Sequence, residues 1–274
     1  MIIIYIFLHF MEFNVELLNS GGFSNVYKTV NKESKTKLKI NQQALSGIHD
    51  ISAGLCIKVS CVDKGTCEYT LMCSLNHENV IQALFGYYDT LIGMYILGMP
   101  YIENEISRES NINYMNMISQ VLAGIHHLHA KGIVHCDIKP SNILVTKSQK
   151  PKFVIIDLNI ANVYKQGGLH KRFRRNLNAS IVGTRPFASL FALLRCLPFC
   201  RDDIESFFLV CLYLKGPRDD PIFTDPEISL SNLREMRIAM QSKYQCIKYL
   251  RSICFFEPLD YDLIYEMMVS EFHE

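Results

Sequence analysis

One stretch of the chain constrains the fold more than any other, because short apolar runs alternate there with acidic and amide side chains. It reads GIVHCDIKPSNILV at residues 132–145 and KFVIIDLN at residues 152–159. Asn142 follows Asp137 by five residues, and Asp157 ends the run FVII, so its carboxylate should emerge at the end of a strand. The alternative is a buried loop and strand whose aspartates only cap turns.

The composition is that of an ordinary globular protein. The 274 residues are 49% hydrophobic and 20% charged, with a formal net charge of +1, so no global charge favours a nucleic acid or a membrane as partner. Ten cysteines are scattered singly and no export signal is evident, which predicts a reduced intracellular protein, in the cytoplasm or nucleus. Cys196 and Cys200 lack the second ligand pair of a zinc site, and we expect them to be small core residues.

The first residues, MIIIYIFLHF, are apolar but are fewer than the roughly 20 residues that a membrane span requires. They carry no basic flank and no small-residue cleavage site. We therefore expect residues 1–12 to be an apolar tail outside the folded domain.

The central stretch resembles the protein kinases. HCDIKPSN at 135–142 is similar to their catalytic loop H-R-D-x-x-x-x-N, and the DLN that begins at Asp157 takes the place of D-F-G. The resemblance implies an α+β fold of two lobes: a β-rich small lobe with the hinge at 13–103, and a mainly helical large lobe at 104–274.

The same resemblance implies a role for each polar residue of the loop. Asp137 would accept the proton of the attacking hydroxyl, while Asn142 and Asp157 would bind Mg²⁺. Lys139 stands two residues after Asp137, as in serine/threonine kinases, where its ammonium neutralises the transferred phosphoryl group. The implied ligands are ATP, Mg²⁺ and a protein substrate.

Residues 13–30 alternate as two strands around the turn NSGGFS. The turn aligns with the family's loop G-x-G-x-x-G-x-V at Asn19, Gly21 and Ser24, with Val26 as the valine. Asn19, Gly21 and Gly22 are therefore candidates for binding phosphate, because glycine lets backbone amides approach closely. The alternative is an ordinary hairpin.

LCIKV at 55–59 resembles the family's V-A-I-K strand, with Lys58 as the phosphate-binding lysine. A lysine in an apolar strand needs a partner, and Glu68 supplies one from a predicted helix. A surface lysine and a surface glutamate are the alternative. Because only ten residues separate the two, we expect this helix to be short or loosely held, which leaves room for an activating partner there.

MYILGMPYIENE at 94–105 reads as a strand that runs out into a polar turn. The resemblance puts Met99 at the back of the nucleotide pocket and assigns Tyr101 and Ile102 to the hinge that bonds the adenine edge. Val26 and Cys56 would cover one face of the adenine ring and Leu144 the other. Taken singly, each of these is typical of a plain core residue.

Residues 112–131 have helical apolar spacing and lead into the catalytic loop. Three later stretches resemble the casein kinase I group, which includes the vaccinia-related kinases: GTRPFAS at 183–189, RDDIES at 201–206 and YLRSICFFEPLDYDLIYEMM at 249–268. Within this resemblance, which spans about 13–270, Asp203 would hold the backbone of the catalytic loop. The hinge also resembles that of the cell-division-cycle kinase that activates replication origins.

The chain departs from the family at three places: HCD replaces HRD, Asn159 replaces the glycine of D-F-G, and Asn19 replaces the first glycine of the phosphate loop. None of these changes removes a catalytic side chain. We therefore favour an active kinase, with a pseudokinase that scaffolds a partner as the alternative.

Two further expectations concern the segment between Asp157 and Gly183, which has no acidic residue. Its basic residues predict a preference for acidic or phosphorylated substrates, with a solvated basic loop as the alternative. They are Lys165, His170, Lys171, Arg172, Arg174 and Arg175. Cys136 stands where many kinases have a phosphate-binding arginine, so activity should not need phosphorylation of this segment, and Thr184 should hydrogen-bond Asp137 and Lys139.

Overall fold

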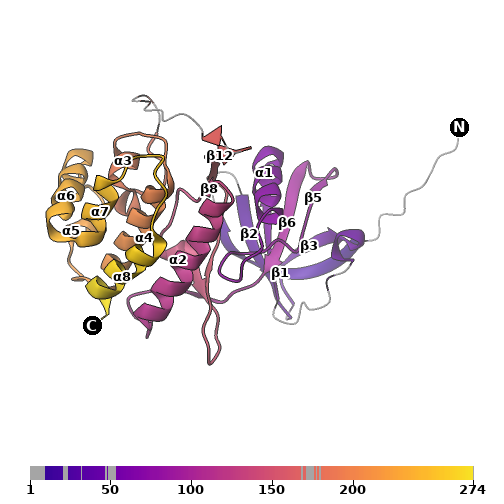
Figure 1. Cartoon of the computed structure of the whole chain (residues 1–274). Coiled ribbons are helices and arrows are strands. Elements are labelled where there is room, and N and C mark those ends of the chain that lie inside the picture. The colour runs from indigo at the N-terminus through magenta and orange to yellow at the C-terminus, as the bar shows by residue number, and fades with distance from the viewer. Residues whose placement is uncertain are drawn as a thin grey trace, which may run out of the picture. The chain divides into compact units, whose positions relative to one another are not determined.

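The computed structural model describes residues 10–20, 24–31, 33–46, 48, 54–167, 169–170, 176, 178 and 180–273 (Figure 1). The chain divides into two compact units. The first comprises residues 1–76 and 81–102, and the second comprises 77–80 and 103–274.

The first unit is built on one antiparallel sheet of six strands in the order β3-β1-β2-β4-β6-β5. Strands β1 and β2 pair antiparallel, as the predicted hairpin requires, and the lysine-rich stretch that follows supplies a further strand and a short helix. The elements are β1 Phe10–Ser20, β2 Ser24–Thr29, β3 Thr36–Asn41, η1 Gln42–Leu45, β4 Leu55–Ser60, α1 Val62–Cys73, β5 Phe85–Asp89 and β6 Met94–Pro100.

Alternation along the strands sends apolar side chains to one face of this sheet, where η1 packs. The buried residues on that face are Val15, Ile40, Leu55, Ile57, Phe85 and Ile96. The backbone N–H of Asn41, at the end of edge strand β3, donates to the phenol oxygen of Tyr87 in the other edge strand at 3.0 Å. The sheet is therefore curved enough to bring its two edges together.

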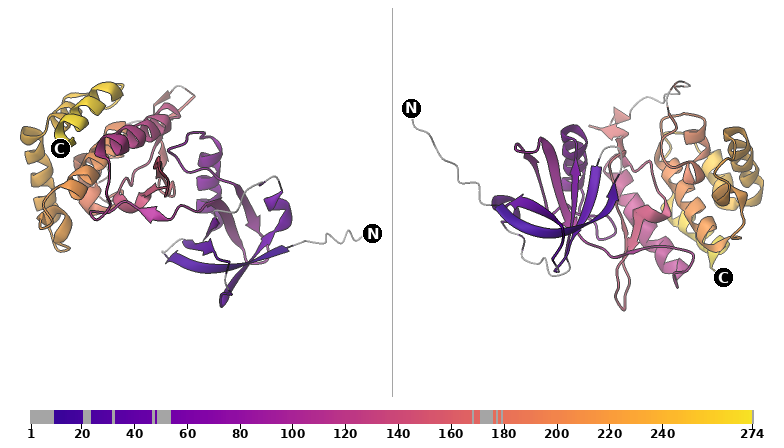
Figure 2. Two further views of the ribbon diagram at one scale, coloured as in Figure 1. Left: turned by 90° about the horizontal axis from the view of Figure 1, so that it is seen from below. Right: turned by 180° about the vertical axis from the view of Figure 1, so that it is seen from behind.

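Helix α1 packs on the opposite face, against β4, β5 and β6 (Figure 2). The close contact depends on Gly65, because a Cβ there would lie 2.5 Å from Cβ of Tyr95 and 2.6 Å from Oγ of Ser60. The helix begins one residue after β4, with Cys61 as its N-cap. The short separation of Lys58 and Glu68 thus reflects a strand that passes into a helix without a loop.

The second unit is mainly helical. Its elements are β7 Asn104–Glu105, α2 Tyr114–Ala130, β8 Ile133–Val134, η2 Pro140–Asn142, β9 Ile143–Val145, β10 Phe153–Ile155, β11 Asn162–Val163, β12 Lys165–Gln166, β13 Leu169–His170, η3 Arg185–Phe187, α3 Leu190–Leu193, α4 Cys200–Lys215, α5 Pro221–Thr224, α6 Leu230–Lys243, α7 Gln245–Ser252 and α8 Tyr261–Phe272.

Helix α4 is the centre of this unit, since it is buried on nearly all sides and contacts α2, α3, α7, α8 and η3 (Figure 2). Phe207, Phe208 and Leu209 are fully buried within its core. The polar residues of its first two turns are buried as well, and each must find a partner inside the protein.

The strongest of these partnerships joins α4 to α7. Arg251 donates from Nη1 to Oε2 of Glu205 at 2.7 Å and from Nη2 to Oε1 at 2.6 Å, and the two side chains are 7% and 1% exposed. Because removal of one partner leaves a buried charge uncompensated, Arg251→Ala should lower the free energy of unfolding by about 3–5 kcal/mol. Urea unfolding of the variant and the wild type measures this loss.

The matched control is Arg218→Ala. Arg218 makes the same bidentate contact with Glu109, at 2.9 and 3.1 Å, but the pair is 71% and 72% exposed. Water solvates the remaining carboxylate, so stability should hardly change. Equal losses in the two variants would contradict the role given to burial.

The structure shows where two expected elements begin. Of the predicted tail, residues 1–9 lie outside the described residues, whereas Phe10, Met11 and Glu12 belong to the sheet and pair with Asn41, Ile40 and Lys39 of β3. The helix expected over 112–131 is α2, which begins at Tyr114 after the Asn113 side chain caps it.

Over the part of the chain that the structure describes, no helix has the length and apolar character needed to cross a membrane.

Candidate active site

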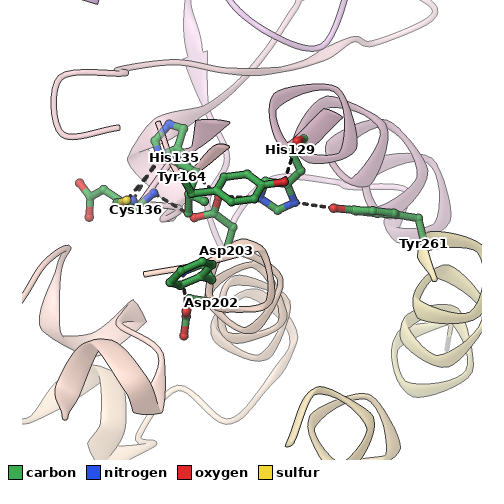
Figure 3. A network of polar contacts seen from close by, with 10 residues as sticks. His129, His135, Cys136, Tyr164, Asp202, Asp203 and Tyr261 are labelled. Atoms are coloured by element: carbon green, nitrogen blue, oxygen red, sulfur yellow. Dashed lines mark hydrogen bonds and ion pairs between the residues drawn. The ribbon is translucent and has the colours of Figure 1, made fainter. Parts of the chain in front are cut away.

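The backbone before Asp137 is held by one buried carboxylate, that of Asp203 in the first turn of α4 (Figure 3). Its Oδ2 accepts from the N–H of His135 at 2.7 Å, and its Oδ1 accepts from the N–H of Cys136 at 2.9 Å. Cys136 has a φ of 70°, a conformation that is costly for a residue other than glycine. Asp203 therefore makes the backbone contacts expected of it and stabilises a strained turn.

The ring of His135 ties this turn to the strand that leads to Asp157. Its Nδ1 accepts from the N–H of Asp137 at 3.2 Å, so the proton lies on Nε2, which donates to the carbonyl of Ile156 at 2.9 Å. One buried imidazole thus joins the backbone of Asp137 to the backbone of Ile156, the residue before Asp157.

The carboxylate of Asp137 is the centre of a cluster. Its Oδ2 lies 2.9 Å from Nζ of Lys139 and 3.3 Å from Nδ2 of Asn142. Its Oδ1 accepts from Thr184 twice, from the N–H at 2.9 Å and from the hydroxyl at 2.8 Å. Lys139 also donates to the Thr184 hydroxyl at 3.1 Å, so a carboxylate, an ammonium and a hydroxyl meet at one place.

Gly183 allows Thr184 to approach the loop. It has a φ of +88°, and a Cβ at this position would lie 2.6 Å from the carbonyl oxygen of Cys136. A side chain would therefore clash with backbone that Asp203 already holds. Glycine is the residue that fits both constraints.

Asn142 and Asp157 are carried by neighbouring strands. Asn142 precedes β9, Asp157 follows β10, and the N–H of Ile156 donates to the carbonyl of Asn142 at 3.0 Å. Nδ2 of Asn142 donates to Asp137, which leaves its amide oxygen directed away from that contact. A carboxylate and an amide oxygen fit Mg²⁺, which takes oxygen ligands and completes its shell with phosphate and water.

The first unit contains the Lys58–Glu68 pair. Nζ of Lys58 in β4 lies 2.9 Å from Oε2 and 3.0 Å from Oε1 of Glu68 in α1, and the residues are 5% and 2% exposed. Because both residues are buried, the alternative of a surface lysine and a surface glutamate is wrong. The ammonium is held at a fixed place on the sheet face opposite the core of Ile57.

Val26, Cys56 and Met99, three of the residues predicted to surround the adenine, lie on the adjacent strands β2, β4 and β6 of the same sheet. Val26 pairs with Lys58, and Cys56 pairs with the buried Met99. Burial raises the pKa of the Cys56 thiol to about 11, so Cys56 presents a neutral surface. Leu144, in β9 of the second unit, pairs with Val154 of β10 and Glu105 of β7.

The predicted hinge follows β6. The N–H of Tyr101 donates to the carbonyl of Gly54 at 3.2 Å, and Ile102 is half-buried. Asn19 pairs with Val26 just after a bulge in β1. Gly21 and Gly22, the two glycines predicted to bind phosphate, lie outside the described residues, as do the basic residues 171–175.

Two residues of the site had no role assigned from the sequence, although Tyr261 belongs to the stretch 249–268 that resembles the casein kinase I group. Nε2 of His129 lies 2.9 Å from Oδ2 of Asp203, and the phenol oxygen of Tyr261 contacts the other ring nitrogen of His129 (Figure 3). The sequence assigns no role to His129, since a histidine at the end of an amphipathic helix has no local signature.

A model of the protein kinase domain matches residues 14–215, which is well over half of the chain. This chain belongs to the protein kinase family. The α+β fold expected from the resemblance is thereby confirmed, with a sheet-based first unit and a helical second unit. As in that family, the expected co-substrate is ATP and the expected partner is a protein.

One relative of the kinase is a probable cell division protein kinase of Encephalitozoon cuniculi (strain GB-M1). The two are 28% identical over 135 residues. These residues are 47% of this chain and 46% of the relative, so the match spans about half the length of each.

Proposed function

We propose that this kinase transfers the γ-phosphoryl group of ATP to serine and threonine hydroxyls of proteins. One observation carries the proposal: Asp137, Lys139, Asn142 and Thr184 form a single hydrogen-bonded cluster, in which the carboxylate lies within 3.3 Å of each partner.

Within this proposal, Asp137 accepts the proton of the attacking hydroxyl. Oδ1 already accepts a hydroxyl hydrogen bond from Thr184 at 2.8 Å, which is the geometry that proton transfer needs. Lys139 lies beside the same carboxylate and neutralises charge on the transferred group. Its position two residues after Asp137 favours serine and threonine over tyrosine.

Lys58 binds the phosphates of ATP, and Glu68 keeps the ammonium oriented. The oxygens of Asp157 and Asn142 hold Mg²⁺, which when bound neutralises charge on the phosphates. Val26, Cys56, Met99, Tyr101, Ile102 and Leu144 bind the adenine.

The test is transfer from radiolabelled ATP to casein, with Mg²⁺ and with EDTA, by the wild type and by Asp137→Asn. Labelling that needs Mg²⁺ and is lost in the variant supports the proposal. Equal labelling by both proteins would indicate a contaminating kinase and support the pseudokinase alternative.

Membership of the casein kinase I group is part of the proposal. It is supported by the A-P-E sequence being absent after Gly183 and by the segment RDDIES at 201–206. In α4, that segment supplies both Asp203, which holds the catalytic loop, and Glu205, which pairs with Arg251.

We also propose a preference for acidic or already phosphorylated substrates. Lys165 and His170 pair with each other across the hairpin β12–β13, and both are exposed. Charge-assisted hydrogen bonds to carboxylates or phosphates would favour such peptides.

A peptide array should therefore show enrichment of Asp, Glu or phosphoserine near the acceptor. Lys165→Ala should lower kcat/KM for an acidic peptide by roughly two- to fivefold, the effect of losing one exposed charge contact. Lys147→Ala removes a lysine that is 80% exposed elsewhere in the unit and should have no such effect. Enrichment of basic residues on the array would contradict the preference.

Activity should not depend on phosphorylation of the segment before Gly183. Cys136 offers no charge to pair with a phosphate, and its Sγ lies 3.4 Å from the carbonyl of Val134. A phosphate on Thr184 would also break the contacts of that hydroxyl with Asp137 and Lys139. Phosphatase-treated protein should label casein at the untreated rate, and a large loss would mean that another residue binds an activating phosphate.

A further inference from the structure

His129 is a buried histidine near the end of α2, and its two ring nitrogens have partners from distant parts of the chain (Figure 3). Nε2 lies 2.9 Å from Oδ2 of Asp203 in α4. Nδ1 contacts the phenol oxygen of Tyr261, the first residue of α8 and 132 residues further along the chain. The C-terminal helix is therefore linked by hydrogen bonds to the carboxylate that holds the catalytic loop.

We propose that Tyr261 is a positioning residue for phosphoryl transfer. Its phenol oxygen accepts a hydrogen bond from Nδ1 of His129 and so keeps a positive charge beside Asp203. The inference rests on the proposed function, because it assumes that the loop held by Asp203 carries the catalytic base, Asp137.

The groups around His129 favour the imidazolium. Asp203 and Cys200 face it from α4 and Tyr261 from α8, while the phenol of Tyr164 donates to its carbonyl at 2.9 Å. Burial lowers the pKa of His129, but the Cys200 sulfur and the hydrogen-bonded Asp203 carboxylate outweigh it and raise the pKa to about 10. The charge is thus kept at neutral pH and lost only as the pH rises through about 10.

The direction of the bond to Tyr261 follows from this charge. An imidazolium donates from both nitrogens, so the phenol oxygen must be the acceptor. Burial raises the pKa of Tyr261 far above its ordinary value, so the phenol remains neutral. His126, on the same helix as His129, stacks on the Tyr261 ring, and burial lowers its pKa, so it adds no second charge.

The charge matters for catalysis because Asp203 serves three donors: His129, the N–H of His135 and the N–H of Cys136. A buried carboxylate without a neighbouring cation tends to take up a proton. A protonated carboxyl has less acceptor capacity, and the strained turn at Cys136 would lose part of its support. Asp137 would then be held less precisely.

The test is Tyr261→Phe, which keeps the ring but removes the acceptor. With Nδ1–H unpartnered in a buried place, the pKa of His129 should fall by about one unit or more, a tenfold change in the protonation equilibrium. Imidazole NMR measures the titration without any need for turnover. With the pKa of His129 lowered from about 10 to about 9, the kcat on casein should be roughly threefold lower at pH 9.5 and unchanged at pH 6.5, with KM for ATP unchanged.

Tyr249→Phe is the matched control. Its phenol oxygen accepts from the N–H of Asp260, the N-cap of α8, at 3.1 Å, so its partner is a backbone group at the start of α8 and not His129. This variant should leave the His129 titration and the pH profile as in the wild type. Circular dichroism melts of both variants check that the fold is retained.

An unchanged or raised pKa of His129 in Tyr261→Phe would overturn the proposal, because the phenol would then be a donor to a neutral ring. A lowered pKa of His129 with an unaltered pH profile of kcat would also overturn the proposal, since the charge on His129 would then have no effect on the loop that carries Asp137. If the wild type transfers no phosphate while the titration shifts as expected, the proposed function has failed and not the link between Tyr261 and His129.

Discussion

Changing Asp137 to asparagine should lower transfer to protein by about 10²- to 10⁴-fold, the usual contribution of a positioned general base. Asparagine retains an oxygen that can accept from the N–H of Thr184, now 2.9 Å from Oδ1, but it has no basicity with which to take a proton. Nucleotide affinity and thermal stability should stay close to those of the wild type. Single-turnover labelling, nucleotide titration and a melting curve measure the three quantities.

Asp219→Asn is the control for this change. Asp219 is an exposed aspartate in the same unit, and its substitution should leave turnover unchanged. If Asp137→Asn also lost its nucleotide affinity, the residue would be acting on ATP binding, and another group would have to be the base.

Changing Asp157 to asparagine should remove the dependence of nucleotide affinity on Mg²⁺ and abolish turnover. Asp157 has a φ of 66°, and asparagine is one of the few residues that tolerate this conformation, so the backbone should not change. What is lost is the negative charge that holds the metal, and the affinity for ATP with Mg²⁺ should fall by at least about a hundredfold.

Calorimetric titration of ATP with Mg²⁺ and with EDTA separates the contribution of the metal to nucleotide affinity from the contribution of the other nucleotide contacts. With EDTA the variant and the wild type should bind equally, because Lys58 and the adenine contacts are untouched. Asp157→Ala is a poorer choice, since alanine adds backbone strain at a positive φ. A variant that still gained affinity from Mg²⁺ would show that the metal is held elsewhere.

The two variants should therefore differ in binding although both fail in transfer. Asp137→Asn should bind ATP with Mg²⁺ and not react, whereas Asp157→Asn should not gain from Mg²⁺ at all. This difference also bears on the departures of the chain from its family. Asn159 lies two residues after Asp157, and retained Mg²⁺ binding in the wild type would indicate that the lost glycine of D-F-G is tolerated.

Local sequence was sufficient for the parts of the site that lie close together in the chain. Asp137, Lys139 and Asn142 span six residues, and the loop between β8 and β9 cannot place them far apart. Lys58 and Glu68 are joined by a strand and the helix that follows at once, so the helical and strand periods largely decide that they meet. Motifs of this kind predict a site because backbone geometry over a few residues leaves few alternatives.

The contact of Thr184 with Asp137 was also predicted, although 47 residues separate them. In this case the resemblance to a family carried the prediction, and the spacing did not. The structure adds the physical reason for the contact, which is that Gly183 has a positive φ and no side chain to meet the carbonyl of Cys136.

The resemblance to a family predicted that Asp203 holds the loop around Asp137, but the side chains that surround Asp203 were decided by tertiary structure alone. His129, Asp203 and Tyr261 lie on three helices, and no period or short motif relates their positions in the sequence. Glu205 and Arg251 likewise form an ion pair between two helices, α4 and α7, that no sequence motif predicts. Such polar residues find their partners because burial makes an unpaired charge costly, and which partner is within reach depends on how the helices pack. Sequence patterns therefore determined the predicted catalytic loop and its contact with Asp203, and the packing around α4 decided which side chains surround Asp203 beneath that loop.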